Sequence, residues 1–214
     1  MAFRAPDFSK PVLKHRNHLP HWEQEGVTCF ITFRLADSVP HEKLDHWMNE
    51  RAAWLEAHGL KHSWEVEWLP DQQRHEFHER FTACFHAWLD TGEGDCLLRQ
   101  EECANIVTGT LRHFDGERYA LESFVVMPNH VHVLVTPREG EKLSGLTHSW
   151  KSYTAHKINE LLSRHGALWQ KESYDHLVRH EEQFHHYRRY IHANPAKAKL
   201  REGEFVWWDA NGAT

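Results

Sequence analysis

The most informative segment of this chain is MPNHVHVLV, residues 127–135. Side chains alternate between the two faces of a β-strand, so residues two apart point the same way. His130 and His132 therefore share one face, while the valines beside them pack on the other. Two imidazoles on a rigid strand can bind one metal ion between them. The chain has 21 histidines among 214 residues, so a solvated or hydrogen-bonded pair is the competing interpretation.

A second motif lies near the C-terminus, where Tyr190 and Asn194 stand four residues apart. Residues with this spacing share one face of a helix. If that helix crosses the histidine face, the Asn194 amide oxygen becomes a third ligand and Tyr190 lies beside the open metal position. Two imidazoles and an amide oxygen favour Mn²⁺ or Mg²⁺ over a closed zinc site.

This set of residues predicts phosphoryl-transfer chemistry. A divalent metal polarises a phosphoryl oxygen and orients the bond to be cleaved. The Tyr190 oxygen can attack in line, leaving a covalent phosphotyrosine and a free 3′-hydroxyl. A second 3′-hydroxyl can reseal that link, which a water nucleophile would not allow. Two alternatives stay open: Tyr190 is a core aromatic residue, or Tyr153, one helical turn before His156, is the nucleophile.

Hydrophobic periodicity predicts strands joined by crossover helices. Strands are expected at 27–35, 118–127, 130–136 and 167–178, and helices at 95–114, 144–162 and 181–193. Pro195 is expected to stop the last helix. The order strand, helix, strand, strand, helix, strand is that of a ferredoxin-like split βαβ fold of the α+β class. The extra C-terminal helix carries the tyrosine.

Two further helices, beginning near Ser38 and Asp71, interrupt this order. They carry tryptophan and phenylalanine at roughly helical spacing, and glycines at 92 and 94 end the second. We therefore expect a single domain over residues 1–214, with a helical hairpin at 38–94 inserted into a loop of the core.

Charge is unevenly distributed along the chain, whose net charge is −6. Residues 41–102 contain 14 acidic and 6 basic side chains, whereas residues 151–200 contain 9 basic and 5 acidic ones. A basic balance is the usual footprint of a nucleic-acid-binding protein, and only the second segment has it. We expect the acidic hairpin to repel a phosphate backbone and to pack on the core away from the histidine face.

Composition excludes several classes of protein. Apolar content of 40% with ten tryptophans indicates a folded globular protein. No apolar run approaches the roughly 20 residues that span a bilayer, and the polar N-terminal segment, broken by Pro6, Pro11 and Pro20, resembles neither a signal peptide nor an anchor. Four cysteines without CxxC spacing predict neither a zinc knuckle nor a disulfide framework. A cytoplasmic protein without a membrane partner is expected.

Three motifs, in this order, resemble one family. MPNHVHVL (127–134), LWQKESYDH (168–176) and YIHANPAKAKL (190–200) are similar to the IS200-like Y1 transposases, and more closely to the REP-associated tyrosine transposases. The likeness covers about residues 27–200, interrupted by the helical hairpin. It departs at Lys199, where family members often have glycine. We expect this change to alter the helix end and not the chemistry.

The resemblance implies an HUH endonuclease fold, with His130 and His132 as the metal pair and Tyr190 as the nucleophile. It places Asn194 where the insertion-sequence enzymes have a glutamine ligand. The implied partner is single-stranded DNA next to a short imperfect hairpin, a repetitive extragenic palindrome, with a guanine-containing tetranucleotide beside it.

The implied activity is that of a metal-dependent single-stranded DNA endonuclease and strand transferase, acting as a monomer or homodimer. DNA would be bound by charge and stacking, and the candidate basic residues are Lys151, Lys157, Arg179, Arg188 and Arg189. Two other functions stay open. One is a non-catalytic binder of palindromic DNA, and the other is a metal-dependent hydrolase of small phosphoesters, which would give Tyr190 no role.

Overall fold

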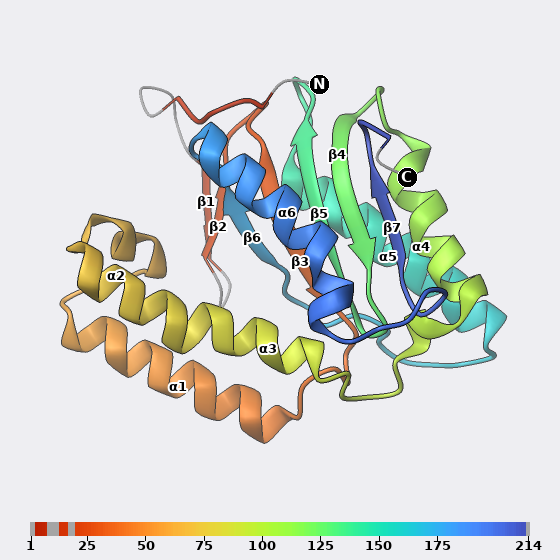
Figure 1. Cartoon of the computed structure of the whole chain (residues 1–214), viewed down its shortest axis with the longest axis horizontal. Helices are drawn as coiled ribbons and strands as arrows, with labels where there is room; N and C mark the ends of the chain where they lie inside the picture. Colours follow the sequence, from red (N-terminus) through yellow and green to blue (C-terminus); the bar gives the residue numbers. More distant parts are fainter. Residues whose placement is uncertain (1–2, 8–12, 17–19, 213–214) are drawn as a thin grey trace.

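The computed structural model describes residues 3–7, 13–16 and 20–212. Its centre is a five-stranded sheet in which every pair of neighbouring strands is antiparallel (Figure 1). The spatial order is β6-β3-β5-β4-β7. The strands are β3 Cys29–Arg34, β4 Tyr119–Val126, β5 His130–Pro137, β6 Tyr174–Leu177 and β7 Val206–Asp209.

Two crossover helices connect the four central strands. Helix α4, Glu101–His113, precedes β4, and helix α5, Leu143–Leu161, joins β5 to β6. The chain order β3-α4-β4-β5-α5-β6 with the sheet order β6-β3-β5-β4 is the ferredoxin-like split βαβ arrangement. The predicted fold class is therefore confirmed. Helix α6, Glu181–Lys197, follows β6 and carries Tyr190.

Three short strands were not predicted from the sequence. β7 adds to the free edge of β4, pairing Val206 with Val126. β1, Leu13–Arg16, and β2, Pro20–Glu23, form a separate two-stranded hairpin before the core. Each has four residues, too few for an alternating pattern to stand out. Of the proline positions named above, Pro11 lies outside the described residues.

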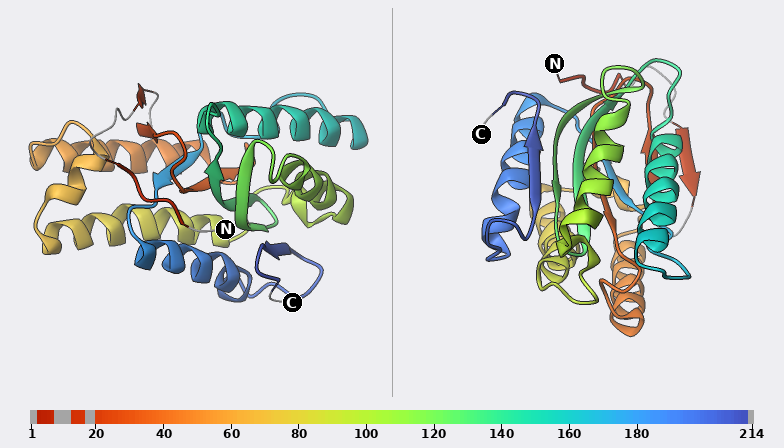
Figure 2. Two further views of the ribbon diagram at one scale, coloured as in Figure 1. Left: turned by 90° about the horizontal axis from the view of Figure 1, so that it is seen from above. Right: turned by 90° about the vertical axis from the view of Figure 1, so that its right-hand side faces the viewer.

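The two faces of the sheet are covered by different helices. Ile31, Phe33 and Val133 point to one face and share a core with residues of α4 and α5. Phe30 and Leu134 point to the other, where they pack against residues of α6. Seen from the side, α5 and α6 lie on opposite sides of the sheet (Figure 2). The two histidines share one face, as the strand periodicity predicts, and that face is the one covered by α6.

Two predicted helix boundaries are wrong. The helix expected from residue 95 begins at Glu101, after a short 3₁₀ turn, η3, at Leu97–Arg99. Pro195 does not stop the last helix, because it lies inside α6, two residues before its end. A proline lacks one N–H and crowds the turn before it. Here the cost stays local, since the next amides bond normally, Ala198 N to Asn194 O at 3.0 Å and Leu200 N to Pro195 O at 2.9 Å.

The inserted segment is helical, as predicted. It contains α1 His41–Ala57, the 3₁₀ helix η1 Ser63–Trp68, α2 Asp71–Phe77, the π-helical stretch η2 His78–Ala83 and α3 Cys84–Asp90. It has its own apolar core, which includes Trp47, Trp54 and Phe81. The Trp47 indole donates to the carbonyl of Phe81 at 3.2 Å and so connects α1 to η2.

The expected position of the insertion is wrong. Helix α3 runs toward the C-terminal end of α6 (Figure 1), and its His86 ring contacts both His132 and Tyr190. The insertion therefore packs against the histidine face. The charge count misled because acidic side chains such as Glu76 and Glu79 lie on the exposed side of the insertion, while aromatic and histidine side chains face the sheet.

Two further sequence predictions concern the chain as a whole. Among the residues that the structure describes, no helix is both long enough and apolar enough to cross a membrane. All four cysteines are free thiols, in keeping with the absence of a predicted disulfide framework.

Candidate active site

His130 and His132 lie side by side on β5 with both side chains fully buried. Their Nε2 atoms are 3.1 Å apart. The rings are nearly perpendicular, at 74°. The two nitrogens therefore converge on one point, as the strand periodicity predicts.

Each imidazole is oriented by a polar contact at its Nδ1 atom, the ring nitrogen that does not face the other histidine. His130 Nδ1 lies 2.8 Å from Asn129 Oδ1, and His132 Nδ1 lies 2.7 Å from the Thr32 hydroxyl. The Asn129 amide nitrogen donates to the carbonyl of Glu93 at 3.0 Å, so its oxygen is the atom that faces His130. An amide oxygen can only accept, and neutral His130 therefore carries its proton on Nδ1 and presents a lone pair at Nε2.

Both histidines are neutral at physiological pH. Burial lowers the pKa of His130 to about 3, with the neighbouring His86 and Arg34 acting in the same direction. Burial, followed by His130 and His86, lowers the pKa of His132 well below its ordinary value. A histidine must be neutral to bind a metal, so these rings need lose no proton to do so.

Helix α6 brings Tyr190 to the histidine pair. The Tyr190 ring centroid lies 5.2 Å from that of His132 and 5.9 Å from that of Phe30, edge-on in both cases. Burial raises the pKa of Tyr190, and the charge of Asp90 adds to the rise. The phenol is therefore protonated in the free protein. The Lys197 ammonium lies 5.0 Å from the centre of its ring.

Asn194 occupies the same face of α6, one turn after Tyr190, and is fully buried. Its amide oxygen makes no hydrogen bond within the described chain, while its side chain lies within hydrogen-bonding reach of the Tyr190 hydroxyl. Buried polar atoms without partners are uncommon in native proteins and call for a ligand, water or ion. Two convergent imidazole lone pairs and an orphaned amide oxygen fit a divalent cation of the Mn²⁺ or Mg²⁺ type.

The insertion adds two side chains that the sequence analysis missed. The His86 ring lies 5.5 Å from that of Tyr190, and Asp90 Oδ1 lies 4.0 Å from His130 Nε2. Burial lowers the pKa of His86 to about 4, and burial raises that of Asp90 to about 6. Their four-residue spacing on α3 was the available signal. The same spacing at His46 and Glu50 lies on an exposed helix face, so spacing alone could not single them out.

A cavity of about 320 Å³ separates the insertion from the β3–β6 edge of the sheet. It borders the site directly, because Thr32 and His86 line it. Its charged lining comprises four basic residues, Arg34, Arg51, Lys171 and Arg179, and three acidic ones, Asp45, Glu172 and Asp175. Arg34 lies over the ring of Phe85 at 5.3 Å, and Arg51 over that of Trp47 at 5.4 Å. The aromatic lining comprises Trp47, Phe77, Phe81, Phe85 and Tyr174.

Among the predicted DNA-binding residues, Lys151, Arg188 and Lys157 have clearly defined protein partners. The Lys151 ammonium donates to the carbonyls of Gln170 and Lys171, at 2.6 and 2.9 Å, and burial lowers its pKa to about 8. Arg188 forms a two-pronged ion pair with Asp209 of β7. Lys157 pairs with Glu160 on the exposed side of α5, at 2.9 Å. Arg188 thus ties α6 to the edge strand.

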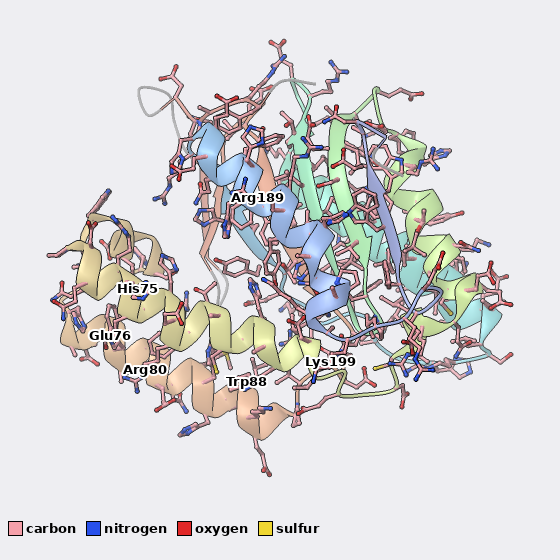
Figure 3. All side chains as sticks on the ribbon, viewed as in Figure 1. His75, Glu76, Arg80, Trp88, Arg189 and Lys199 are labelled. Carbon is pink, nitrogen blue, oxygen red and sulfur yellow. The ribbon has the colours of Figure 1, made fainter. Side chains whose placement is uncertain are left out.

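Other predicted residues have clear positions. Arg189 and Lys199 lie on α6 and at its C-terminal end, and both are exposed (Figure 3). Tyr153 is 53% exposed on α5, on the side of the sheet opposite the histidines, so the structure does not bring it to the metal pair. Lys199 has a left-handed backbone, φ 55°, the conformation that glycine adopts with least strain. The lysine therefore strains the helix end.

Within the described chain, no three side chains of the His, Cys, Asp and Glu types are already drawn together as a metal-binding group. The pair of histidines with Asn194 falls outside that definition, because an amide supplies the third donor. Asp90 Oδ1 stays 4.0 Å from His130 Nε2, so it does not complete such a group in the metal-free chain.

Comparisons with known proteins agree with the motifs. The family model "Transposase IS200 like" matches residues 98–194, a segment that contains the histidine pair, Tyr190 and Asn194. No curated protein matches the chain. Among solved structures, the chain is similar to a REP-associated tyrosine transposase bound to a REP hairpin, with 16% identity and a TM-score of 0.45 over 85% of this chain and 74% of that one. Residues 98–194 of this chain are therefore similar to the IS200-like transposase family.

Proposed function

We propose that this protein cuts and rejoins single-stranded DNA beside a hairpin, through a covalent bond between Tyr190 and a DNA 5′-phosphate. The observation that carries the proposal is the convergence of the His130 and His132 Nε2 atoms, 3.1 Å apart, next to the ring of Tyr190. A metal-free binding protein gains nothing from two buried neutral imidazoles aimed at one point.

The chemistry divides between the divalent cation and the protein. When bound, the cation neutralises charge on the scissile phosphate and orients it for in-line attack. His130, His132 and Asn194 would hold it. Asn129 and Thr32 keep the two rings in place from behind, as outer-shell partners of metal ligands do.

Tyr190 is the nucleophile in this proposal. Its oxygen forms a bond to phosphorus while the bond from phosphorus to the 3′ oxygen breaks. The phenol loses its proton and the departing 3′ oxygen gains one. The downstream DNA stays attached through a 5′-phosphotyrosine, and attack by another 3′-hydroxyl reverses the step. Lys197, beside the Tyr190 ring, would offset negative charge on the phosphate.

The cavity next to the site is suited to the single-stranded flank of the hairpin. Aromatic rings offer stacking surfaces for bases, and arginines offer charge for the backbone. Because Thr32 and His86 belong to both the cavity and the site, a strand lying in the cavity would pass beside Tyr190. Arg179 is the predicted DNA-binding residue placed there.

The test is a search for the covalent adduct. A hairpin oligonucleotide with a randomised single-stranded flank is labelled at its 3′ end, since the downstream fragment stays on the protein. It is incubated with the protein and Mn²⁺ and resolved on a denaturing gel. We expect a labelled adduct with the wild type and with Tyr153→Phe, and none with Tyr190→Phe, while all three bind the hairpin equally.

Other results point to the other functions. Tight hairpin binding without adduct or cleavage indicates a non-catalytic palindrome binder. Metal-dependent release of a free 5′-phosphate that survives Tyr190→Phe indicates a hydrolase that uses water.

A further inference from the structure

The C-terminal end of α3 brings a carboxylate to the histidine pair. Asp90 Oδ1 is 4.0 Å from His130 Nε2. This oxygen is buried and makes no hydrogen bond within the part of the chain that the structure describes. A buried carboxylate oxygen loses the hydration that stabilises its charge, so an arrangement of this kind requires a compensating cation or proton.

The segment that follows Asp90 is fixed by contacts with two other parts of the chain. The Asn129 amide that orients His130 also donates to the carbonyl of Glu93, three residues after Asp90. The backbone N–H of Asp95 donates to the Asp37 carboxylate at 2.7 Å. Gly94, φ 89°, packs so closely on Asp37 that a Cβ there would lie 2.8 Å from it. The end of the insertion is thus anchored beside the histidines.

We propose that Asp90 is a metal ligand, supplied by the insertion to the site formed by His130 and His132. This inference rests on the proposed function, because it concerns the same metal site. Two neutral imidazoles and one amide bring no negative charge to a divalent cation. Mn²⁺ and Mg²⁺ prefer carboxylate oxygen, and Asp90 provides one that makes no hydrogen bond within the described residues and interacts with Lys197 through charge alone.

Two of the three distances between the donor atoms of His130, His132 and Asp90 are compatible with one ion. Donors about 2.1 Å from an octahedral ion lie about 3 Å apart when adjacent and about 4.2 Å apart when opposite. The two Nε2 atoms, at 3.1 Å, fit the first relation, and Asp90 Oδ1 with His130 Nε2, at 4.0 Å, fits the second. The insertion is then part of the active site and sets its preference for a hard cation.

The test measures metal binding by the full chain without DNA. Mn²⁺ is titrated into the metal-free protein and free Mn²⁺ is read by its electron paramagnetic resonance signal. Asp90→Asn should weaken Mn²⁺ binding by at least about tenfold, since loss of an outer-shell partner alone costs about 10- to 100-fold. The matched control is Glu79→Gln, which removes one exposed charge from the same insertion and should stay within about twofold.

A second readout separates ligand loss from general damage. Removal of a carboxylate weakens binding of a hard cation more than that of Zn²⁺, which accepts imidazole readily. The ratio of Mn²⁺ to Zn²⁺ affinity should therefore fall in Asp90→Asn and in Asp90→Ala. Thermal melting of the metal-free variants shows that they are folded, and an unchanged ratio in the folded variants contradicts the inference.

The role of Asp90 and the metal site of the two histidines can be disproved separately. Wild-type Mn²⁺ affinity in Asp90→Asn, together with lost affinity in His130→Ala, overturns the role of Asp90 and leaves the histidine site intact. No Mn²⁺ binding by the wild type overturns the metal site itself, and this inference with it.

Discussion

Replacement of Thr32 by valine should remove the contact that orients the His132 ring and leave the rest of the fold unchanged. Thr32 lies opposite His132 in the register of β3 and β5, and its hydroxyl contacts Nδ1 at 2.7 Å. Valine keeps the shape and the strand preference of threonine and removes only the hydroxyl. Burial of the Nδ1 atom without a partner costs about 1–3 kcal/mol of unfolding free energy.

The same change should reduce metal affinity. Loss of an outer-shell partner weakens metal binding by about 10- to 100-fold, or about 1.4–2.7 kcal/mol. Thr32→Ser should restore most of that affinity, because it returns the hydroxyl. Urea unfolding of the metal-free protein gives the first quantity, and Mn²⁺ titration gives the second.

Thr136→Val is the matched control. Thr136 is buried on the same strand as His132, and its hydroxyl bonds to that of Thr28 at 2.8 Å instead of to a histidine. It should lower stability by a similar amount and leave Mn²⁺ affinity unchanged. Equal Mn²⁺ affinity in Thr32→Val and Thr136→Val would refute the view that Thr32 positions a metal ligand.

Four further predictions concern the site and its surroundings. EDTA, or His130→Ala, should reduce DNA cleavage by at least about 100-fold and leave hairpin binding in place; full activity in EDTA would exclude a metal mechanism. Arg188→Ala should lower the unfolding free energy by about 1.5–3 kcal/mol, since its ion pair with Asp209 is partly buried, and urea denaturation measures this. Lys199→Gly should raise it by about 0.5–1 kcal/mol, because glycine relieves the left-handed strain, and a decrease would contradict that reason. Arg179→Gln should weaken binding of a hairpin with a single-stranded flank more than binding of a flankless one, while Lys157→Gln should affect neither in a fluorescence-anisotropy titration.

The sequence predicted the fold through elements whose patterns are local. The alternation around His130 and His132 identified β5 and the face of each histidine, and both are as predicted. The helix periodicity of α5 and α6 was equally clear. The predicted helix boundaries were wrong where the surrounding structure outweighed a local sequence preference. Pro195 is typical of a helix stop, but the helix continues through it to Lys197, and the Ala198 amide still donates to the Asn194 carbonyl.

The candidate site was only partly predictable, because it combines residues from three distant segments. The histidine strand and the tyrosine helix carry recognisable motifs. Asp90 and His86 do not, since their position depends on how the insertion docks, and docking is set by contacts such as that between Asn129 and Glu93. Lys151 and Arg188 were predicted to bind DNA for a related reason. A sequence shows that Lys151 and Arg188 are charged, but not that a loop carbonyl or Asp209 already binds them.

Net charge led to a wrong prediction of where the insertion packs. Electrostatic repulsion acts between surfaces, and the side of the insertion that meets the sheet bears Arg51 and His86 beside two carboxylates, Asp45 and Asp90. The remaining acidic residues cannot repel a strand that enters through a cavity lined by arginines, because water and salt screen exposed charges within about 10 Å. An acidic segment can therefore form one wall of an anion-binding site, provided that arginines line the same cavity and the carboxylate beside the histidines serves a cation.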